Sequence, residues 1–197
     1  LGGLVLYQYW IINACAIEIA PQHLAALRRH PMVATVQPDA ESHPLIKTAT
    51  NANNHNSDAL QAKGFAGNGV GCAIIDTGQD VNMNGSGKIH ITYSRRGDLT
   101  KSRLCAQRKM GSMAFDDVHG HGTGVASIAA GWKWKTGTAD NGHAYDANIA
   151  GYSIANATNG NSSTSTMAAA YNQVAADAAS CKIVATNLSY SGSSNPT

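Results

Sequence analysis

The sequence predicts an α/β protein built on a parallel sheet with flanking helices, preceded by a small α+β unit. Two observations carry this prediction. From about residue 57 onward, apolar strand-like runs alternate with segments of helical period, which is the pattern of parallel α/β sheets. Residues 1–42 instead combine a strand-rich stretch with a single helix, and a polar segment separates them from the rest. The 197 residues therefore divide into two units of unequal size.

The first unit, residues 1–42, is expected to hold strands and one helix. Residues 4–19 are rich in Val, Ile, Tyr and Trp and predict one or two strands. Pro21 opens a helix, because its missing N–H costs nothing in a first turn, and His30-Pro31 ends it. Residues 33–36 predict a further strand. Because so small a module buries little surface alone, we expect it to dock on something larger.

Residues 43–56 are interpreted as a linker, since they are mostly polar, include four asparagines and develop no period. We expect this linker to be exposed and open to proteases. The second unit, residues 57–197, carries the α/β pattern. Its predicted strands and helices are, in chain order, a short helix capped by Ser57 and ending near Ala62, strand 70–75, helix 122–130, strand 147–153, a helix with the apolar positions Met167, Ala170, Tyr171, Val174 and Ala178, and strand 183–188.

We expect neither nucleic-acid nor membrane partners, although the net charge alone argues neither for nor against a polyanionic partner. The net charge is only +2, although six of the 14 basic residues cluster between positions 95 and 109. We interpret this cluster as a solvated loop or hairpin, because only Tyr93 could stack on a base. Residues 4–20 are too short and too polar for a membrane span.

The four cysteines show no CxxC or zinc-finger spacing. Cys72 lies in a predicted strand and is expected to be a small buried residue. A disulfide between Cys105 and Cys181 would suit an oxidising compartment, but the sequence alone does not assign it.

Asp76 ends the apolar strand 70–75 and is followed by Thr77-Gly78. Ligands of parallel sheets bind beyond the carboxyl ends of the strands, so a carboxylate here is a candidate catalytic group. A plain turn-capping role is the simpler alternative. The triplet DTG also occurs in aspartic proteases, but that chemistry needs two such loops and only one is present.

His121 stands between two glycines at the start of a predicted helix, where its ring can reach a cleft. An acid that orients a histidine, and a histidine that takes a proton from a hydroxyl, are two members of a Ser-His-Asp triad. Helix capping is one alternative. A metal site is another, with ligands drawn from His119, His121, Asp116, Asp117 and His143. The small-residue helix after His121 favours close packing near an active site, so we expect no metal there.

Three ordered motifs resemble those of the subtilisin-like serine proteases, the subtilases of peptidase family S8. Residues 67–78 (GNGVGCAIIDTG) resemble the segment of the catalytic Asp, and residues 117–127 (DVHGHGTGVAS) that of the catalytic His. The order, Asp before His, is also that of subtilisin. Residues 184–192 (VATNLSYSG) resemble the strand that ends in the family's substrate-binding segment, and residues 1–42 resemble an inhibitor I9-type propeptide.

The resemblance implies the first half of a subtilisin-like sheet and a set of roles. Asp76 and His121 would be catalytic, while Ser189, Tyr190 and Ser191 would bind an extended substrate as an added strand. The propeptide would assist folding and inhibit the zymogen until removal, with self-cleavage in the linker. Gly124, Ser127, Gln79, Tyr190 and Ser191 depart from the commonest pattern, which bears on substrate fit and local packing more than on the chemistry.

The nucleophile serine is not found in these 197 residues, so we expect a fragment truncated at both ends, inactive by itself. The resemblance implies a secreted endopeptidase that acts on polypeptides, binds its own propeptide and needs no cofactor for its chemistry. It leaves structural calcium undecided. The alternative is a non-catalytic subtilase-like module for binding or folding, which predicts that any downstream sequence lacks the nucleophile.

Overall fold

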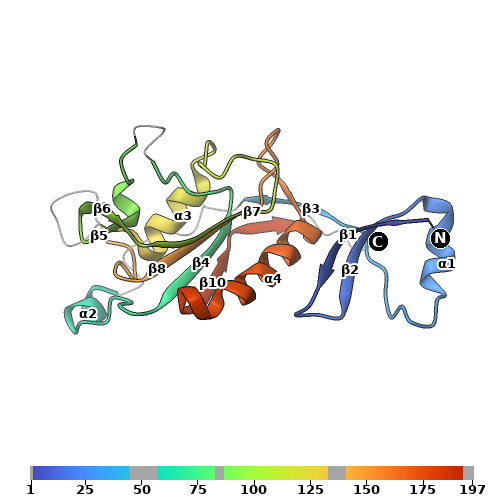
Figure 1. Ribbon diagram of the computed structural model, residues 1–197, viewed down its shortest axis with the longest axis horizontal. Coiled ribbons are helices and arrows are strands. Elements are labelled where there is room, and N and C mark those ends of the chain that lie inside the picture. Colours follow the sequence, from blue (N-terminus) through green and yellow to red (C-terminus); the bar gives the residue numbers. More distant parts are fainter. Residues whose placement is uncertain (1, 45–56, 83–86, 133–140, 193–197) are drawn as a thin grey trace.

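The structure, a computed structural model, describes residues 2–44, 57–82, 87–132 and 141–192. The N-terminal unit comprises residues 2–44, and the sheet unit comprises residues 57–192. The two lie end to end, with the long helix α4 (Thr164–Cys181) of the sheet unit nearest to the junction (Figure 1). Within the described ranges, every helix is too short or too polar to cross a bilayer.

The sheet unit contains the predicted parallel sheet. Its four strands are β4 (Gly71–Asp76), β7 (Leu104–Lys109), β8 (Asn148–Ser153) and β10 (Ile183–Leu188). They lie in the order β10-β4-β8-β7, and each neighbouring pair is parallel. Three of the four were predicted from their apolar runs. Every residue of β4 but Cys72 is buried, as the unbroken apolar run indicated.

Two helices cover opposite faces of this sheet. Side chains alternate along a strand, so Ala73 and Ile75 point to one face and Ile74 to the other. The first face forms a core with α4, and the second forms a core with α3 (His121–Ala130). The sheet unit also begins with the predicted short helix α2 (Ser57–Ala62).

Only part of the basic cluster between positions 95 and 109 lies in a hairpin, whereas a solvated loop or hairpin was predicted for the whole cluster. Strands β5 (Ser94–Arg95) and β6 (Asp98–Ser102) do form an antiparallel hairpin, just after the short 3₁₀ helix η3 (Ile91–Tyr93). The prediction was wrong for Arg103, whose side chain is only 1% exposed. Its guanidinium donates to the carbonyl oxygens of Thr92, Ser94 and Ala147. Burial lowers the pKa of Arg103 to about 10.

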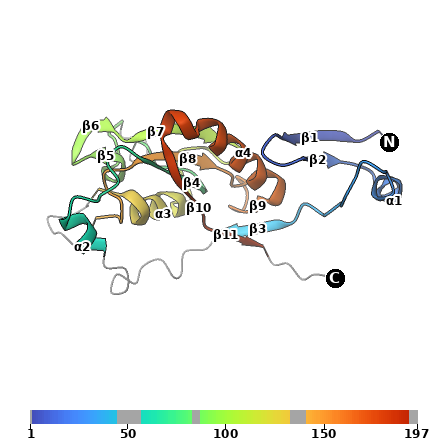
Figure 2. The same cartoon turned by 90° about the horizontal axis from the view of Figure 1, so that it is seen from below.

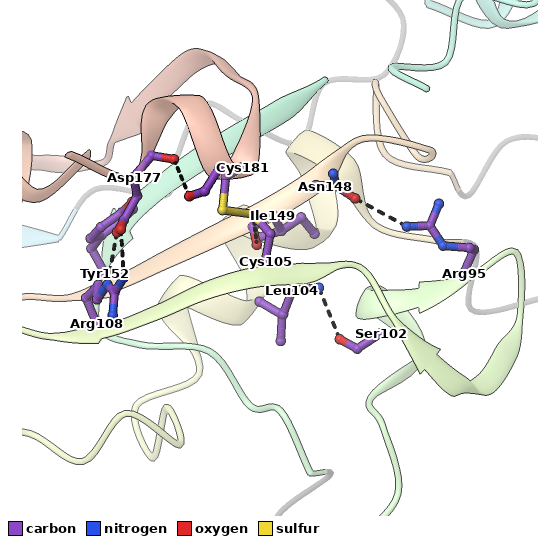
Figure 3. Close-up of a disulfide and its surroundings, with 11 residues drawn as sticks. Arg95, Ser102, Leu104, Cys105, Arg108, Asn148, Ile149, Tyr152, Asp177 and Cys181 are labelled. Atoms are coloured by element: carbon purple, nitrogen blue, oxygen red, sulfur yellow. Dashed lines mark hydrogen bonds and ion pairs between the residues drawn. A yellow bond between two sulfur atoms is a disulfide. The ribbon is translucent and has the colours of Figure 1, made fainter. Parts of the chain in front are cut away.

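Strand β7 was missed because its last three residues are polar. Arg108 nevertheless lies in the sheet, and its guanidinium makes two bonds of 2.9 and 2.6 Å to the carboxylate of Asp177 in α4. The sequence left a disulfide between Cys105 and Cys181 unassigned, and the structure contains it. Cys105 of β7 is bonded to Cys181 at the end of α4 (Figure 3). Cys15 and Cys72 are free thiols.

The N-terminal unit contains the strands predicted for residues 4–19 and the predicted helix. Strands β1 (Leu4–Tyr9) and β2 (Ala14–Glu18) form an antiparallel hairpin, followed by the 3₁₀ turn η1 (Pro21–His23) and helix α1 (Leu24–Arg28). The strand predicted for residues 33–36 is wrong, since these residues have no regular structure. Within the described residues β2 pairs only with β1, so residues 33–36 have no neighbouring strand with which to form a ladder.

A short strand, β3 (Glu41–Pro44), connects the two units. It lies in the middle of a three-stranded antiparallel sheet with β11 (Tyr190–Gly192) and β9 (Ser162–Ser163) of the sheet unit (Figure 2). Its last two residues had been assigned to the linker. Residues 45–56, the rest of that linker, lie outside the described residues.

Candidate active site

Asp76 is the last residue of β4 and is completely buried. Its carbonyl oxygen accepts a hydrogen bond from the backbone N–H of Ile154, which fixes the strand end. One carboxylate oxygen, Oδ1, accepts the N–H of Thr77 at 2.7 Å. A buried carboxylate is costly unless it is hydrogen-bonded, so Asp76 depends on such partners.

His121 begins α3, and two glycines allow it to stand there. Gly120 has φ of +82°, a conformation in which a side chain is strained. Gly122 passes so close to the preceding motif that a Cβ would lie 2.2 Å from the carbonyl oxygen of Gly78. These two observations explain the Gly-His-Gly pattern: Gly120 adopts the left-handed backbone before the helix, and Gly122 lets the two motifs approach closely.

The two predicted catalytic residues are in direct contact. Nδ1 of His121 lies 2.6 Å from Oδ1 of Asp76, and the two side chains are 6% and 0% exposed. Because a carboxylate can only accept, this contact assigns the proton to Nδ1 of the ring. A neutral ring in that tautomer has an acceptor at Nε2, which is the state required of a general base.

The third predicted segment lies next to this pair. Tyr190 is buried, its ring centroid is 6.5 Å from that of His121, and its hydroxyl donates to the carbonyl oxygen of Gly160. Burial raises the pKa of Tyr190, and the negative charges of Asp76 and Asp117 raise it further. Ser189 lies just before β11, and its hydroxyl accepts from the side chain of Asn187. Ser191 is exposed and pairs with His43 of β3.

The metal alternative gains no support. Within the described ranges, no group of three or more His, Cys, Asp or Glu residues is arranged to hold a metal ion. The ring of His119 contacts that of His121 edge-on, at a centroid distance of 6.1 Å. Asp117, considered as a ligand from the sequence, instead accepts hydrogen bonds from Thr77 and Thr123.

Sequence reasoning missed the polar support of this site. Gln79 was noted only as a departure from an aliphatic pattern, yet its side chain is fully buried. Its Oε1 accepts the hydroxyl of Tyr93 at 2.7 Å, and burial raises the pKa of Tyr93, so this hydroxyl remains a donor. Gly151 makes room for Gln79, because a Cβ there would lie 2.6 Å from its Cγ. The one available signal was a polar residue where the motif expects an apolar one.

The fold and the site define the class of protein: an α/β protein with a buried carboxylate–imidazole pair at the carboxyl edge of its parallel sheet. Comparison with known proteins then gives the family. The model of the subtilase family (peptidase S8) matches residues 67–196, well over half of the chain. The chain therefore belongs to the subtilase family, as its motifs predicted.

One similar protein is alkaline elastase YaB of Bacillus sp. (strain YaB). It is 29% identical to this chain over 126 residues. The aligned part covers 64% of this chain but only 29% of the relative. The chain thus spans less than a third of the length of the relative that it matches.

Proposed function

We propose that the full-length protein is a serine endopeptidase in which Asp76 and His121 are two members of the triad. The observation that carries this proposal is the buried 2.6 Å contact between His121 Nδ1 and Asp76 Oδ1. In the proposed reaction, His121 Nε2 takes the proton of a serine hydroxyl as the serine oxygen attacks the peptide carbonyl carbon. Asp76 holds the ring in place and stabilises the imidazolium. His121 then gives the proton to the leaving amine, and water hydrolyses the acyl-enzyme through the same ring. This chemistry needs no cofactor.

The nucleophile serine is proposed to lie in a part of the full-length protein outside these 197 residues. The coverage of the relative supports this, since more than two thirds of that protease is not aligned with this chain. The non-catalytic alternative makes the opposite prediction, that no such serine exists.

Ser189, Tyr190 and Ser191 are proposed to bind the substrate backbone as an added strand. The pairing of β3 with β11 supports this role, because it shows that the edge of β11 accepts an antiparallel strand next to His121. Polypeptides are therefore the proposed substrates.

Residues 1–42 are proposed to be an I9-like propeptide, 43–56 a linker and 57–197 the first part of the peptidase domain. Three contacts of the N-terminal unit with α4 support docking of this kind. Asp39 accepts the backbone N–H of Ser165 at 2.6 Å and also accepts its hydroxyl. The hydroxyl of Tyr9 donates to the carbonyl oxygen of Ser165. The side chain of Asn172 accepts the backbone N–H of Trp10.

In this proposal, β3 holds the position of a substrate strand and inhibits the zymogen. It runs from Glu41 to Pro44, and Pro44 is the residue paired with Tyr190, the residue beside His121. The chain therefore leaves β3 next to the Asp76–His121 pair, which supports self-cleavage within residues 43–56. We propose that the mature enzyme is then released and secreted.

Covalent labelling of the full-length protein tests the proposal. A fluorophosphonate should label one serine located beyond residue 197, and His121→Ala should abolish the labelling. N-terminal sequencing of the secreted wild-type protein should give a chain that begins between residues 44 and 57. Absence of a labelled serine, together with a secreted chain that still begins near Leu1, would favour the non-catalytic module instead.

A further inference from the structure

We propose that Asp117 is a positioning residue that sets the separation of Asp76 and His121 through their chain neighbours. The inference rests on the proposed function, because it assigns a task to Asp117 within that site. The starting observation is its burial: Asp117 is 3% exposed, and no cationic side chain of the described residues forms an ion pair with it. Its carboxylate is instead satisfied by hydrogen bonds alone.

These hydrogen bonds come from both catalytic motifs. Oδ1 accepts the hydroxyl of Thr77 at 2.6 Å and the backbone N–H of Gly120 at 3.1 Å. Oδ2 accepts the backbone N–H of Thr123 at 2.7 Å and its hydroxyl at 2.5 Å. Thr77 directly follows Asp76, while Gly120 and Thr123 lie on either side of His121. One carboxylate therefore holds the neighbours of both members of the pair.

A further bond closes the arrangement into a ring. The hydroxyl oxygen of Thr77 accepts the backbone N–H of Gly122 at 2.9 Å while its hydrogen is given to Asp117. Thr77, the residue after Asp76, is thus bonded both to Gly122, the residue after His121, and to the carboxylate of Asp117. Any shift of α3 relative to the end of β4 would break several of these bonds at once.

The backbone of Asp117 indicates that this position is held against strain. Its φ is +28°, in the left-handed region that non-glycine residues rarely adopt. The opposing residue is Gly78, where a Cβ would lie 3.2 Å from the Cα of Asp117. Such strain persists only when the surroundings over-determine it, and it gathers at functional sites.

The simpler interpretation is that Asp117 only caps α3, since it accepts N–H groups near the start of that helix. A cap affects the stability of the fold and leaves the geometry of the catalytic pair unchanged. The bond to Thr77 separates the two interpretations, because Thr77 belongs to the other motif and directly follows Asp76, so this bond links Asp117 to the acid of the pair. The test must therefore report on the Asp76–His121 contact itself.

Proton NMR of the 197-residue chain with ¹⁵N-labelled histidine provides that report. The Nδ1–H of His121, shared with Asp76, should give a downfield resonance in the wild type. We expect it to be lost or strongly broadened in Asp117→Asn, whose amide would present N–H groups to donors. Thr77→Val should have the same effect without any change of charge, and it decides the matter if Asp117→Asn does not fold. The matched control is Asp98→Asn, because Asp98 makes the same pair of bonds to a threonine, Thr100, on the exposed hairpin.

In the full-length enzyme, Asp117→Asn should lower kcat by roughly 10- to 100-fold and leave KM within about twofold, as expected for a misplaced general base. A variant that keeps the wild-type resonance and kcat, and loses only thermal stability, would overturn the proposal and leave Asp117 as a helix cap. If the wild-type full-length protein cleaves no peptide, the proposed peptidase function fails. The NMR comparison still decides whether Asp117 positions the pair.

Discussion

The N-terminal unit and the sheet unit differ sharply in how much of each is buried. Residues 2–40 include no buried residue, and Leu4, Val5 and Trp10 are all more than half exposed. The sheet unit instead holds two cores, one on each face of the parallel sheet. Because burial of apolar surface is the main favourable contribution to folding, only the sheet unit has a source of stability of its own.

The stability of the N-terminal unit therefore depends on its contacts with the sheet unit. These contacts are the pairing of β3 and a few hydrogen bonds to α4. The interface between the two units retains a cavity of about 470 Å³. It is lined by Tyr7 and Asp39 of the N-terminal unit and by Ser162, Ser163 and Thr166 of the sheet unit. The interface is therefore polar and incompletely packed, which is compatible with the proposed release of the N-terminal unit.

The largest expected effect concerns the N-terminal unit alone. A peptide of residues 1–44 should lack stable structure, because an isolated two-stranded hairpin without a core is marginal at best. Circular dichroism and amide hydrogen exchange would show it, with the same amides in the 197-residue chain as the reference. A cooperative unfolding transition in the isolated peptide would show that the N-terminal unit is stable by itself, and would contradict its dependence on the sheet unit.

A second prediction concerns the disulfide, which strengthens only the sheet unit. Cys105→Ser should lower the free energy of unfolding by about 2–4 kcal/mol, because the bond closes a loop with a sequence separation of 76. Urea denaturation under oxidising conditions measures this. Cys15→Ser is the control, since Cys15 is a free and exposed thiol of the N-terminal unit and should leave the midpoint unchanged. Equal effects of the two variants would contradict the account.

The smallest expected effect concerns the ion pair between Arg108 of β7 and Asp177 of α4, which contributes to stability in a pH-dependent way. The guanidinium of Arg108 lowers the pKa of Asp177 below its ordinary value of 3.8. A depressed carboxyl pKa adds stability above the ordinary pKa, and this stability is lost as pH falls through the folded-state value. Because the side chain of Arg108 is 46% exposed, we expect no more than about 1 kcal/mol. The difference in unfolding free energy between wild type and Asp177→Asn should be present at pH 6 and shrink toward pH 2. A difference that grows on acidification would refute the assignment.

The sequence predicted well the features that short stretches of chain encode. The apolar runs of β4, β8 and β10 predicted three of the four strands of the parallel sheet. The strand end and the Gly-His-Gly pattern pointed to Asp76 and His121, whose side chains the structure places in contact, while their catalytic role stays a prediction. Each of these signals is complete within about ten residues, so no knowledge of distant partners was needed.

Features that depend on distant partners were missed. Arg108 of β7 is bonded to Asp177, 69 positions away. In the described part of the chain, β3 pairs with strands that come more than 100 residues later. The reverse error occurred at residues 33–36, where a strand-like composition finds no partner. Asp117 was considered only as a metal ligand, because its bond to Thr77 joins residues 40 positions apart.

The central claim is that Asp76 and His121 act as a catalytic pair, and one measurement tests it most directly. Peptide hydrolysis by the full-length protein should be compared between wild type and Asp76→Asn, which keeps the shape of the side chain and removes its charge. The account predicts that kcat falls by about 10⁴-fold while KM changes little, because the histidine loses its orienting acid. An Asp76→Asn protein that hydrolyses peptides at the wild-type rate would contradict it.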